Sequence, residues 1–313
     1  MEGQKAMQPI HNVAILGAGA MGAYFAACFQ DAPGFNTVLI AQGERRRRLQ
    51  AEGLRVNGKT YQFPVVDGTQ EGQSVDFLVV AVKHHQLAAA LDSLGHLAGE
   101  QTIFLSVMNG LESEEIIAAR YGWEQVLYAI SVGIDAVRED GQVRYSKPGI
   151  HYFGEARNDT LSAKVLRVQE AFDRAGIHGE TPVDMLRKLW WKYMVNVGVN
   201  QASAVMRAPY GVFHQDGDAQ ALMEALMREV VALAQASQVD LSEQDIRDWY
   251  PVLRQLSPQG KTSMLQDVEA GRKTEVEIFG GRAITLGEQL GVPTPVNASV
   301  THIIRVLERS AGV

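Results

Sequence analysis

Five short apolar runs, each bounded by polar or glycine-containing sequence, alternate with longer mixed stretches in the first half of the chain. The runs are NVAIL (12–16), TVLI (37–40), DFLVVAV (76–82), TIFLSV (102–107) and VLYAISV (126–132). Continuous apolar runs of this length are typical of strands buried on both faces, as in a parallel sheet covered by helices. Residues 20–30 and 111–122 have the pattern of such helices. The first half therefore predicts an α/β unit.

Two interludes in this half have a different pattern. Residues 54–66 and 142–155 each combine short β-type runs with Gly or Pro. Short strands that are punctuated in this way are typical of hairpins, so we expect antiparallel additions to the sheet at both places.

From about residue 181 onward, the β-type runs nearly vanish and helical stretches replace them. The stretches are 181–206, 218–238, 242–256, 274–291 and 297–309, and several open with Thr, Ser or Asp, which are favourable helix caps. Gly and Pro mark the change at HGETP (178–182). The pattern predicts an α/β domain over 1–180 and an all-α domain over 181–313. A ligand cleft between two domains is a common arrangement.

Composition narrows the classes of function. With 313 residues, of which 46% are hydrophobic and 21% charged, the chain is long enough for two ordinary globular domains. Its formal net charge of −7 and pI near 5.7 argue against a nucleic-acid-binding surface. The single cysteine, Cys28, excludes an internal disulfide framework, and we find neither a leader nor an apolar run of membrane length. We therefore expect a soluble, cytoplasmic protein with no nucleic-acid or membrane partner.

A glycine loop follows the first predicted strand directly. ILGAGAMGAYFA has the pattern G-x-G-x-x-G at Gly17, Gly19 and Gly22, and it opens a predicted helix. In this motif the first glycine permits a tight turn, the second lets the backbone approach a pyrophosphate, and the third allows close packing of helix and strand. The free N–H groups of the helix N-terminus then face the anion. The order of strand, loop and helix predicts a Rossmann-type dinucleotide-binding domain, although a tight turn without a ligand would also explain the glycines.

The choice between NADP and NAD depends on the end of the second strand. NAD sites usually carry an acidic residue there, which binds the ribose hydroxyls. Here Gln42 stands at that point and Glu44 comes later. The run Arg45–Arg48 follows, and guanidinium groups bind a 2′-phosphate well, although such a run is also typical of a solvated helix start. The missing acid favours NADP, with NAD as the second possibility.

Three polar residues interrupt the apolar segment WWKYMVNVGVN. Lys192, Asn196 and Asn200 recur at steps of four, which places them on one face of a helix. Separately, each has a structural explanation, because a lysine can extend to solvent and an amide can bond within its own helix. Together they indicate a stripe that faces a substrate. A lysine at such a site can protonate a carbonyl oxygen while hydride arrives from a nicotinamide.

Other candidates lie at strand ends and helix starts. Lys83 ends LVVAVKHH and Asn109 follows TIFLSV, at the carboxyl ends of predicted strands, where open α/β sheets bind their ligands. Ser263, with Gln266 three residues later, has a capping-box pattern, and Thr274 with Glu277 has another. Spacing alone leaves open whether Ser263 and Glu275 are helix-terminal residues only or also face a ligand. Paired Cys, HExxH and G-x-S-x-G motifs are absent, so we expect no metal site and no acyl-transfer elbow.

Over nearly its whole length the chain resembles the ketopantoate reductase (2-dehydropantoate 2-reductase) family. The segments that carry the resemblance are ILGAGAMG, LVVAVKHHQ, MNGLE, RKLWWKYMVNVGVN and SMLQDVEAGRKTEVE. The resemblance implies NADPH-dependent reduction of ketopantoate to pantoate, on the route to pantothenate and coenzyme A. It implies that Lys192 donates the proton to the C2 carbonyl oxygen and that Glu275 positions Lys192 and the cofactor.

The resemblance also implies the binding residues. The cofactor would contact Gly17, Ala18, Gly19, Ala20, Met21, Gly22, Gln42, Lys83, Asn109 and Glu275. The substrate, a small 2-oxo acid, would contact Asn109, Asn196, Asn200 and Ser263.

This sequence departs from the family pattern at three positions. Met108 replaces a residue that is often polar, Gln42 stands where an arginine often meets the 2′-phosphate, and Tyr210 occupies the region of another substrate asparagine. The last departure is compatible with a different 2-oxo acid.

Two different functions are also compatible with the sequence. One is that of a β-hydroxyacid dehydrogenase, which shares the two-domain plan, and the other is that of a sensor that binds NADPH without turnover. The last helices are amphipathic enough for a homodimer, but equally for packing within their own domain.

Overall fold

The computed structural model describes residues 8–68, 72–139 and 141–313. The chain divides into two compact units, Met1–Leu186 (unit 1) and Arg187–Val313 (unit 2). Unit 1 contains the sheets and unit 2 is helical, so the predicted α/β fold followed by an all-α fold is confirmed.

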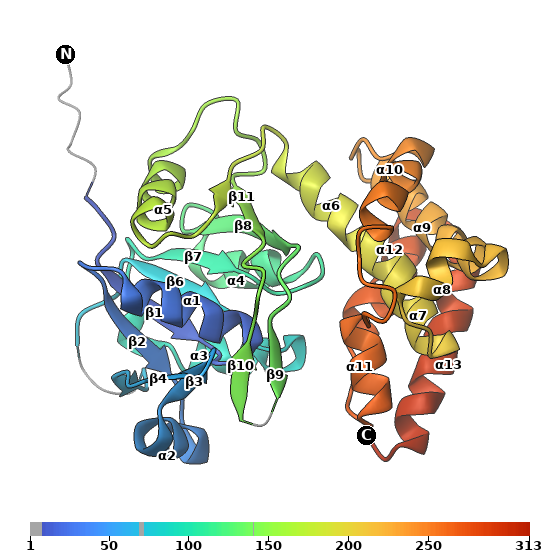
Figure 1. Cartoon of the computed structure of the whole chain (residues 1–313). Coiled ribbons are helices and arrows are strands. Elements are labelled where there is room, and N and C mark those ends of the chain that lie inside the picture. The colour runs from blue at the N-terminus through green and yellow to red at the C-terminus, as the bar shows by residue number, and fades with distance from the viewer. Residues whose placement is uncertain (1–7, 69–71, 140) are drawn as a thin grey trace. The chain divides into compact units, whose positions relative to one another are not determined.

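Unit 1 is built on a sheet with the strand order β12-β11-β8-β7-β6-β1-β2-β5 (Figure 1). Its strands are β1 (Asn12–Leu16), β2 (Asn36–Ile40), β5 (Val65–Val66), β6 (Phe77–Val80), β7 (Ile103–Ser106), β8 (Val126–Val132), β11 (Ile150–Gly154) and β12 (Gly179–Glu180). The strands from β8 to β5 in this order are parallel to one another, whereas β11 is antiparallel to β8. Because β1 lies between β2 and β6, the order of strands reverses beside it. Open α/β sheets bind their ligands at such a switch point.

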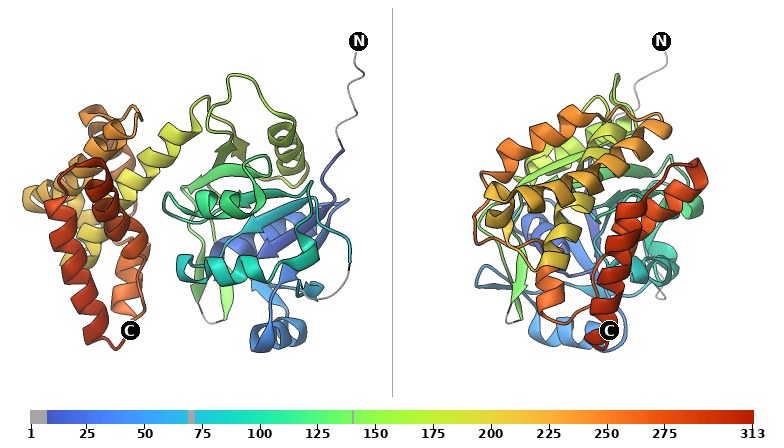
Figure 2. Two further views of the ribbon diagram at one scale, coloured as in Figure 1. Left: turned by 180° about the vertical axis from the view of Figure 1, so that it is seen from behind. Right: turned by 90° about the vertical axis from the view of Figure 1, so that its right-hand side faces the viewer.

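Both faces of this sheet are covered, which explains the continuous apolar runs. Val13 and Ile15 of β1 pack into one core with residues of α1 (Ala20–Asp31) and α5 (Ala163–Arg174). Ala14 and Leu16 point to the other face and pack with α3 (Leu87–Asp92) and α4 (Ser113–Tyr121). Figure 2 shows this second face from behind. The remaining helices of unit 1 are α2 (Gly43–Glu52) and the 3₁₀ turns η1 (His84–Gln86) and η2 (Gly95–Leu97).

A second, smaller sheet has the order β4-β3-β10-β9. Its strands are β3 (Leu54–Val56), β4 (Lys59–Tyr61), β9 (Val137–Glu139) and β10 (Gln142–Arg144). The antiparallel prediction is confirmed for β3 with β4, for β9 with β10 and for β11 with β8. It is wrong for β5, which joins β2 in parallel, and β10 has a second, parallel partner in β3 that was not predicted. Local turn signals specify hairpins, but they carry no information on partners far away in the sequence.

Unit 2 consists of helices, which Figure 1 shows from yellow to red. They are α6 (Met185–Val195, which begins in unit 1), η3 (Asn196–Asn200), α7 (Gln201–Met206), α8 (Tyr210–Gln215), α9 (Gly217–Ala236), α10 (Glu243–Leu253), α11 (Ser263–Glu269), η4 (Glu277–Gly281), α12 (Arg282–Leu290) and α13 (Pro295–Ser310). Both η3 and η4 are π-helical turns. The stretch predicted as one regular helix over 181–206 is therefore two α-helices joined by a π-helical turn.

The core of unit 2 contains a polar network in addition to apolar side chains. The carboxylate of Glu229 accepts hydrogen bonds from the backbone N–H groups of Val296 and Asn297, at 2.8 and 2.9 Å, and so caps α13. The fully buried Asn297 side chain accepts a hydrogen bond from Gln201 at 2.9 Å. These contacts fix α7, α9 and α13 relative to one another, because each buried polar group has its partner on another helix.

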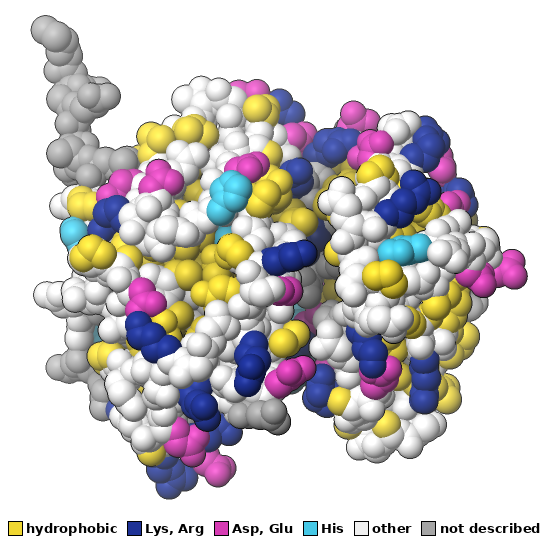
Figure 3. All heavy atoms as spheres, viewed as in Figure 1, with side chains coloured by type: hydrophobic (Ala, Val, Ile, Leu, Met, Phe, Trp, Pro, Cys, Tyr) yellow, Lys and Arg dark blue, Asp and Glu magenta, His cyan; other side chains and the backbone are white. Residues whose placement is uncertain are grey.

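Charged side chains of both signs are interspersed on the face shown in Figure 3, so the net negative charge is not gathered there into one patch. In the described part of the chain, no helix is long and apolar enough to cross a membrane.

Candidate active site

The glycine loop has the geometry that the motif predicts, but its three glycines differ in what they contact. Gly17 has φ +104°, and a Cβ there would lie 2.5 Å from the backbone oxygen of Ala81, which directly follows the neighbouring strand β6. A Cβ on Gly22 would lie 1.8 Å from the oxygen of Gly17. Around Gly19 there is space, since the nearest atom to its Cβ position, the Ala81 oxygen, is 4.0 Å away. Two glycines are therefore required by the fold, and the middle one leaves an open surface beside the start of α1.

This open surface suits an anion. Gly19 is the N-cap of α1 and has no side chain to cap the helix, and the first turn of α1 carries no acidic residue. The N–H groups of that turn and the positive end of the helix dipole then favour a negatively charged group. A dinucleotide pyrophosphate fits this combination of space and charge.

Substitutions at Gly19 and Gly22 are expected to separate binding from folding. Gly22→Ala should lower the free energy of unfolding by about 3 kcal/mol, because its Cβ overlaps backbone. Gly19→Ala should change the free energy of unfolding by less than about 1 kcal/mol but weaken NADPH binding about tenfold or more. Urea denaturation and NADPH fluorescence titration measure the two effects. Tight NADPH binding by Gly19→Ala would contradict the assignment.

Lys83 and Asn109 lie at the same edge of the sheet as the glycine loop. Lys83 follows β6 and is exposed, and Asn109 follows β7 and is half-buried. Gly110 adopts φ +99°, which turns the chain after Asn109. His84 Nε2, after β6, lies 3.5 Å from a carboxylate oxygen of Glu112, which precedes α4. The structure thus brings Gly17–Gly22, Lys83 and Asn109 together at the carboxyl ends of adjacent parallel strands.

A buried series of hydrogen bonds lies beneath the loop between β7 and α4, which carries Asn109 (the Asn109 loop). The sequence motifs did not indicate it. The Ser106 hydroxyl donates to Ser113 Oγ, and Ser113 donates to Glu114 Oε2, each at 2.8 Å. All three side chains are at most 2% exposed. Burial, opposed by hydrogen bonds from Ser113 and the Ala129 backbone, raises the pKa of Glu114 to about 7. The sequence offered one signal for this buried carboxyl group: Glu114 stands beside the apolar residues of the predicted helix.

The four arginines of the run Arg45–Arg48, after β2, have different surroundings. Gln42 is exposed and is the N-cap of α2, so no acidic residue ends β2. Arg46 forms an ion pair with Asp67, whereas Arg47 and Arg48 are exposed. The pKa of Arg45 is lowered by burial and then by the positive charges of Arg138 and Arg48.

Arg138, on β9, is a second residue that the sequence motifs did not indicate. Its Nη1 donates to the backbone oxygen of Ala18 in the glycine loop at 3.2 Å. Within the described residues, neither Arg138 nor Arg45 has a carboxylate at ion-pair distance. A group of like charges therefore lies beside the glycine loop at the start of α2, where a second phosphate would be stabilised.

In unit 2, the polar stripe runs through the π-helical turn. Lys192 is half-buried on α6, Asn196 is half-buried at the start of η3, and Asn200 is 6% exposed at its end. Asn200 Nδ2 donates to Asn196 Oδ1 at 3.2 Å, so the two amides are held in one orientation. Gly198, between them, lies against α9, where a Cβ would be 2.5 Å from Met227. Single π-helical turns within α-helices are frequent at functional sites.

Contacts within unit 2 attach the segments that carry Ser263 and Glu275 to α6 and α7. Tyr193, next to Lys192, donates its hydroxyl to the Phe279 oxygen of η4 at 2.7 Å, and Glu275 immediately precedes that π-helical segment's cap. The prediction that Ser263 caps α11 is wrong. Thr262 is the N-cap and accepts from the Leu265 N–H, while Ser263 is exposed at the first helical position. The hydroxyl of Thr262 also donates to that of Ser203 on α7 at 3.1 Å, which attaches this helix start to α7.

The predicted capping box of Thr274 with Glu277 is also wrong. The Thr274 N–H and hydroxyl both donate to Glu308 Oε1 on α13, at 2.7 and 2.6 Å. Glu277 instead binds Arg305 through two hydrogen bonds of 2.9 and 2.6 Å. Partners on α13 therefore replace the local ones, and they fix the segment that carries Glu275.

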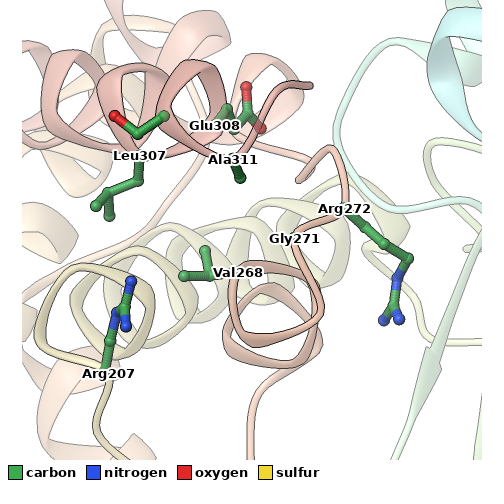
Figure 4. A pocket seen from close by; sticks show the side chains of 8 residues that line it. Arg207, Val268, Gly271, Arg272, Leu307, Glu308 and Ala311 are labelled. Atoms are coloured by element: carbon green, nitrogen blue, oxygen red, sulfur yellow. The ribbon is translucent and has the colours of Figure 1, made fainter.

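A hollow of about 150 Å³ in unit 2 is lined by other residues (Figure 4). They are Arg207, Val268, Gly271, Arg272, Leu307, Glu308, Ser310 and Ala311. The side chain of Arg272 extends away from the rest. No predicted site residue lines this hollow, and Glu308 is already bound by Thr274. In the described part of the chain, no group of three His, Cys, Asp or Glu residues is arranged to hold a metal ion.

Family models match both units of the chain. Residues 13–158 match the model described as "Ketopantoate reductase PanE/ApbA", and residues 184–308 match "Ketopantoate reductase PanE/ApbA C terminal". The chain belongs to the ketopantoate reductase family. The predicted resemblance is thereby confirmed, and the coarse class of activity in this family is that of an NAD(P)-dependent oxidoreductase.

Individual relatives of the family agree over the whole length. A 2-dehydropantoate 2-reductase from Archaeoglobus fulgidus is 28% identical over 302 residues, which is 96% of this chain and 98% of the relative. One from Mesorhizobium japonicum is 27% identical and covers 96% and 99% of the two chains.

Two solved structures have the same fold. A D-mandelate dehydrogenase, in a ternary complex with NADH and anilino(oxo)acetate, has a TM-score of 0.87 at 22% identity and covers 96% and 100% of the two chains. A ketopantoate reductase from Ralstonia eutropha JMP134 has a TM-score of 0.82 at 24% identity with the same coverage. At these identities the likeness concerns the fold.

Proposed function

We propose that this protein reduces a small 2-oxo acid with NADPH, and that the substrate is ketopantoate and the product pantoate. The observation that carries the proposal is the stripe of Lys192, Asn196 and Asn200. Its two amides are fixed by a mutual hydrogen bond, one turn after a half-buried lysine. The names of relatives that match nearly the full chain support the choice of ketopantoate.

In the proposed reaction, the cofactor supplies a hydride to the C2 carbonyl carbon. Lys192 gives a proton to the carbonyl oxygen as negative charge develops there, and it recovers the proton from solvent. Asn196 and Asn200 bind the hydroxyl end of the substrate, and Ser263 binds the carboxylate. Glu275 positions Lys192, and a carboxylate near the ammonium favours its protonated form. Asn109 contacts both the nicotinamide ribose and the substrate.

For the cofactor we propose NADPH. The residues Gly17–Gly22 bind the pyrophosphate, Lys83 contacts the cofactor, and Arg45 with Arg138 binds the 2′-phosphate. Among the residues that the structure describes, these two guanidinium groups have no carboxylate partner. They are costly without an anion, since like charges repel and burial removes water from Arg45. The two arginines thus bind the 2′-phosphate, for which the neutral side chain of Gln42 supplies no charge.

The assay that tests the function follows NADPH oxidation at 340 nm with ketopantoate. We expect turnover with NADPH, a higher kcat/KM than with NADH, and a lower kcat/KM for other 2-oxo acids. The panel includes the 2-oxo acid that corresponds to mandelate, because Tyr210 departs from the family pattern and a mandelate dehydrogenase shares the fold.

Three results would change the proposal. A preference for another 2-oxo acid would retain the reaction class and change the substrate. Oxidation of hydroxyisobutyrate without reduction of ketopantoate would favour a β-hydroxyacid dehydrogenase. Binding of NADPH without consumption across the panel would favour a sensor.

A homodimer is part of the proposal as well. A ketopantoate reductase from Staphylococcus aureus with a TM-score of 0.78, at 21% identity, is described as dimeric. Light scattering on the purified protein measures the state of this chain directly.

A further inference from the structure

The hydrogen-bond chain under the Asn109 loop ends in a carboxyl group that the proposed reaction does not use. Glu114 is 1% exposed, in the first turn of α4. Its Oε2 accepts from Ser113 at 2.8 Å and its Oε1 accepts from the Ala129 N–H of β8 at 3.4 Å. A carboxylate that is buried in this way loses its hydration, and only part of the loss is replaced by these donors.

The series of hydrogen bonds connects this carboxyl group to the Asn109 loop. Ser113 Oγ accepts from Ser106, the last residue of β7, and Ser106 Oγ accepts from the Met108 N–H at 3.4 Å. Met108 is 7% exposed and directly precedes Asn109. Every hydroxyl in this series donates toward Glu114, which is the direction that an ionised carboxylate requires, because it can only accept.

Protonation of Glu114 would reverse this direction. A protonated carboxyl group donates one hydrogen bond, so Ser113 would accept from Glu114 and donate to Ser106. The Ser106 hydroxyl would then have to turn away from Ser113 and find another acceptor. The Met108 N–H, in the loop before Asn109, donates to the Ser106 hydroxyl. The two protonation states of Glu114 therefore impose different hydrogen bonding on this loop.

The other groups that act on Glu114 do not remove this dependence. Glu115, on the same helix, is exposed and raises the pKa of Glu114 further, although by less than burial does. Tyr128, on β8, has its own pKa raised to about 12, first by burial and then by Glu114, Glu115 and Glu155. The phenol is therefore neutral at the pH values at which Glu114 changes its charge.

We propose that Glu114 is a positioning residue for the reductase: when ionised, it orients Ser113 and Ser106 and thereby holds Asn109 in the conformation used by cofactor and substrate. The inference rests on the proposed function of Asn109. Glu114 acts through other residues, and it touches neither reactant.

A cost in stability accompanies this arrangement. The pKa of Glu114 is raised from its ordinary 4.5 to about 7 in the folded chain. The stability that the protonated form contributes is therefore fully present below about pH 4.5 and is lost as the pH rises through about 7. At neutral pH the carboxyl group thus opposes folding, which is expected of a residue that serves the site.

Two variants test the inference on the full chain. Glu114→Gln keeps the shape of the side chain but removes the charge, and Ser113→Ala interrupts the hydrogen-bond chain while Glu114 stays. Glu115→Gln is the matched control, because it removes the same charge from the neighbouring residue. The first readout is kcat with ketopantoate and NADPH from pH 6 to 8. The second is the ¹⁵N side-chain amide resonance of Asn109, assigned by its absence in Asn109→Asp.

We expect the ratio of wild-type to Glu114→Gln kcat to rise about tenfold between pH 6 and 8, with a smaller change in the KM for NADPH. The Asn109 resonance should titrate with a midpoint near pH 7 in the wild type and at a lower pH in Glu115→Gln, and should be constant in Glu114→Gln and in Ser113→Ala. A resonance that titrates in Glu114→Gln as in the wild type would overturn the inference. Inactivity of the wild type toward ketopantoate would instead refute the proposed function, and the resonance would still decide the role of Glu114.

Discussion

Replacing Lys192 with alanine is expected to lower kcat for ketopantoate reduction by roughly 10²–10⁴-fold. The affinity for NADPH should stay within about twofold, since an interaction made only in the transition state contributes to kcat and not to cofactor binding. Steady-state kinetics at 340 nm and NADPH fluorescence titration measure the two quantities. The prediction fails if kcat and NADPH affinity decrease by the same factor.

Two further variants separate proton donation by Lys192 from the effect of its positive charge and from the effect of any lysine substitution on α6. Lys192→Arg keeps a positive charge, but a guanidinium does not release its proton near neutral pH, so kcat should stay low. Lys188→Ala is the matched control, because Lys188 lies one turn earlier on α6, where it approaches the ring of Trp191 to 5.9 Å. Its kcat should be close to that of the wild type. Recovery of kcat in Lys192→Arg would show that charge alone is sufficient.

Much of the fold could be predicted because burial on both faces leaves a simple pattern. The bounds of β1 and β8 agree with the predicted runs, and their neighbours in the sheet differ by one or two residues. The parallel pairing of β10 with β3 could not be predicted, because these strands lie far apart in the sequence and have three residues each. Such short strands gain their pairing from tertiary packing more than from their own residues.

The π-helical turn at η3 is another feature that the sequence did not predict. Steps of four residues fit a regular helix, and one additional residue in a turn changes no residue type. Gly198 is a signal in retrospect, since it interrupts an apolar run and lets α9 approach closely.

Local motifs indicated some candidate residues, whereas contacts between distant segments could not be predicted from the sequence. The glycine loop follows from residues within six positions. The group formed by Arg45 and Arg138 joins segments that are far apart in the sequence, and Glu308 replaces Glu277 as the partner of Thr274 from another helix. Spacing rules describe neighbours along one element, so they are silent about partners that the tertiary fold supplies.

Arg138→Ala, which removes the guanidinium, is expected to raise the KM for NADPH roughly 10- to 100-fold. This factor corresponds to the loss of one hydrogen bond to a charged group, about 1.5–3 kcal/mol. The KM for NADH should change much less, because NADH has no 2′-phosphate. Arg138 also donates to the Ala18 oxygen, so any change with NADH measures the effect on the glycine loop itself. The preference for NADPH over NADH, as a ratio of kcat/KM values, isolates the contribution of the phosphate.

Arg45→Ala should have the same effect on this ratio, with a different effect on stability. Burial and the charges of Arg138 and Arg48 lower the pKa of Arg45, so the ionised guanidinium opposes folding when no anion is bound. Thermal unfolding of Arg45→Ala without cofactor should therefore occur at the wild-type temperature or above it, while the stabilisation by added NADPH decreases. Arg47→Ala is the matched control, since Arg47 is exposed in the same run and should leave both quantities unchanged. A lower unfolding temperature for Arg45→Ala, with an unaltered NADPH preference, would make Arg45 a structural residue and leave the 2′-phosphate to other groups.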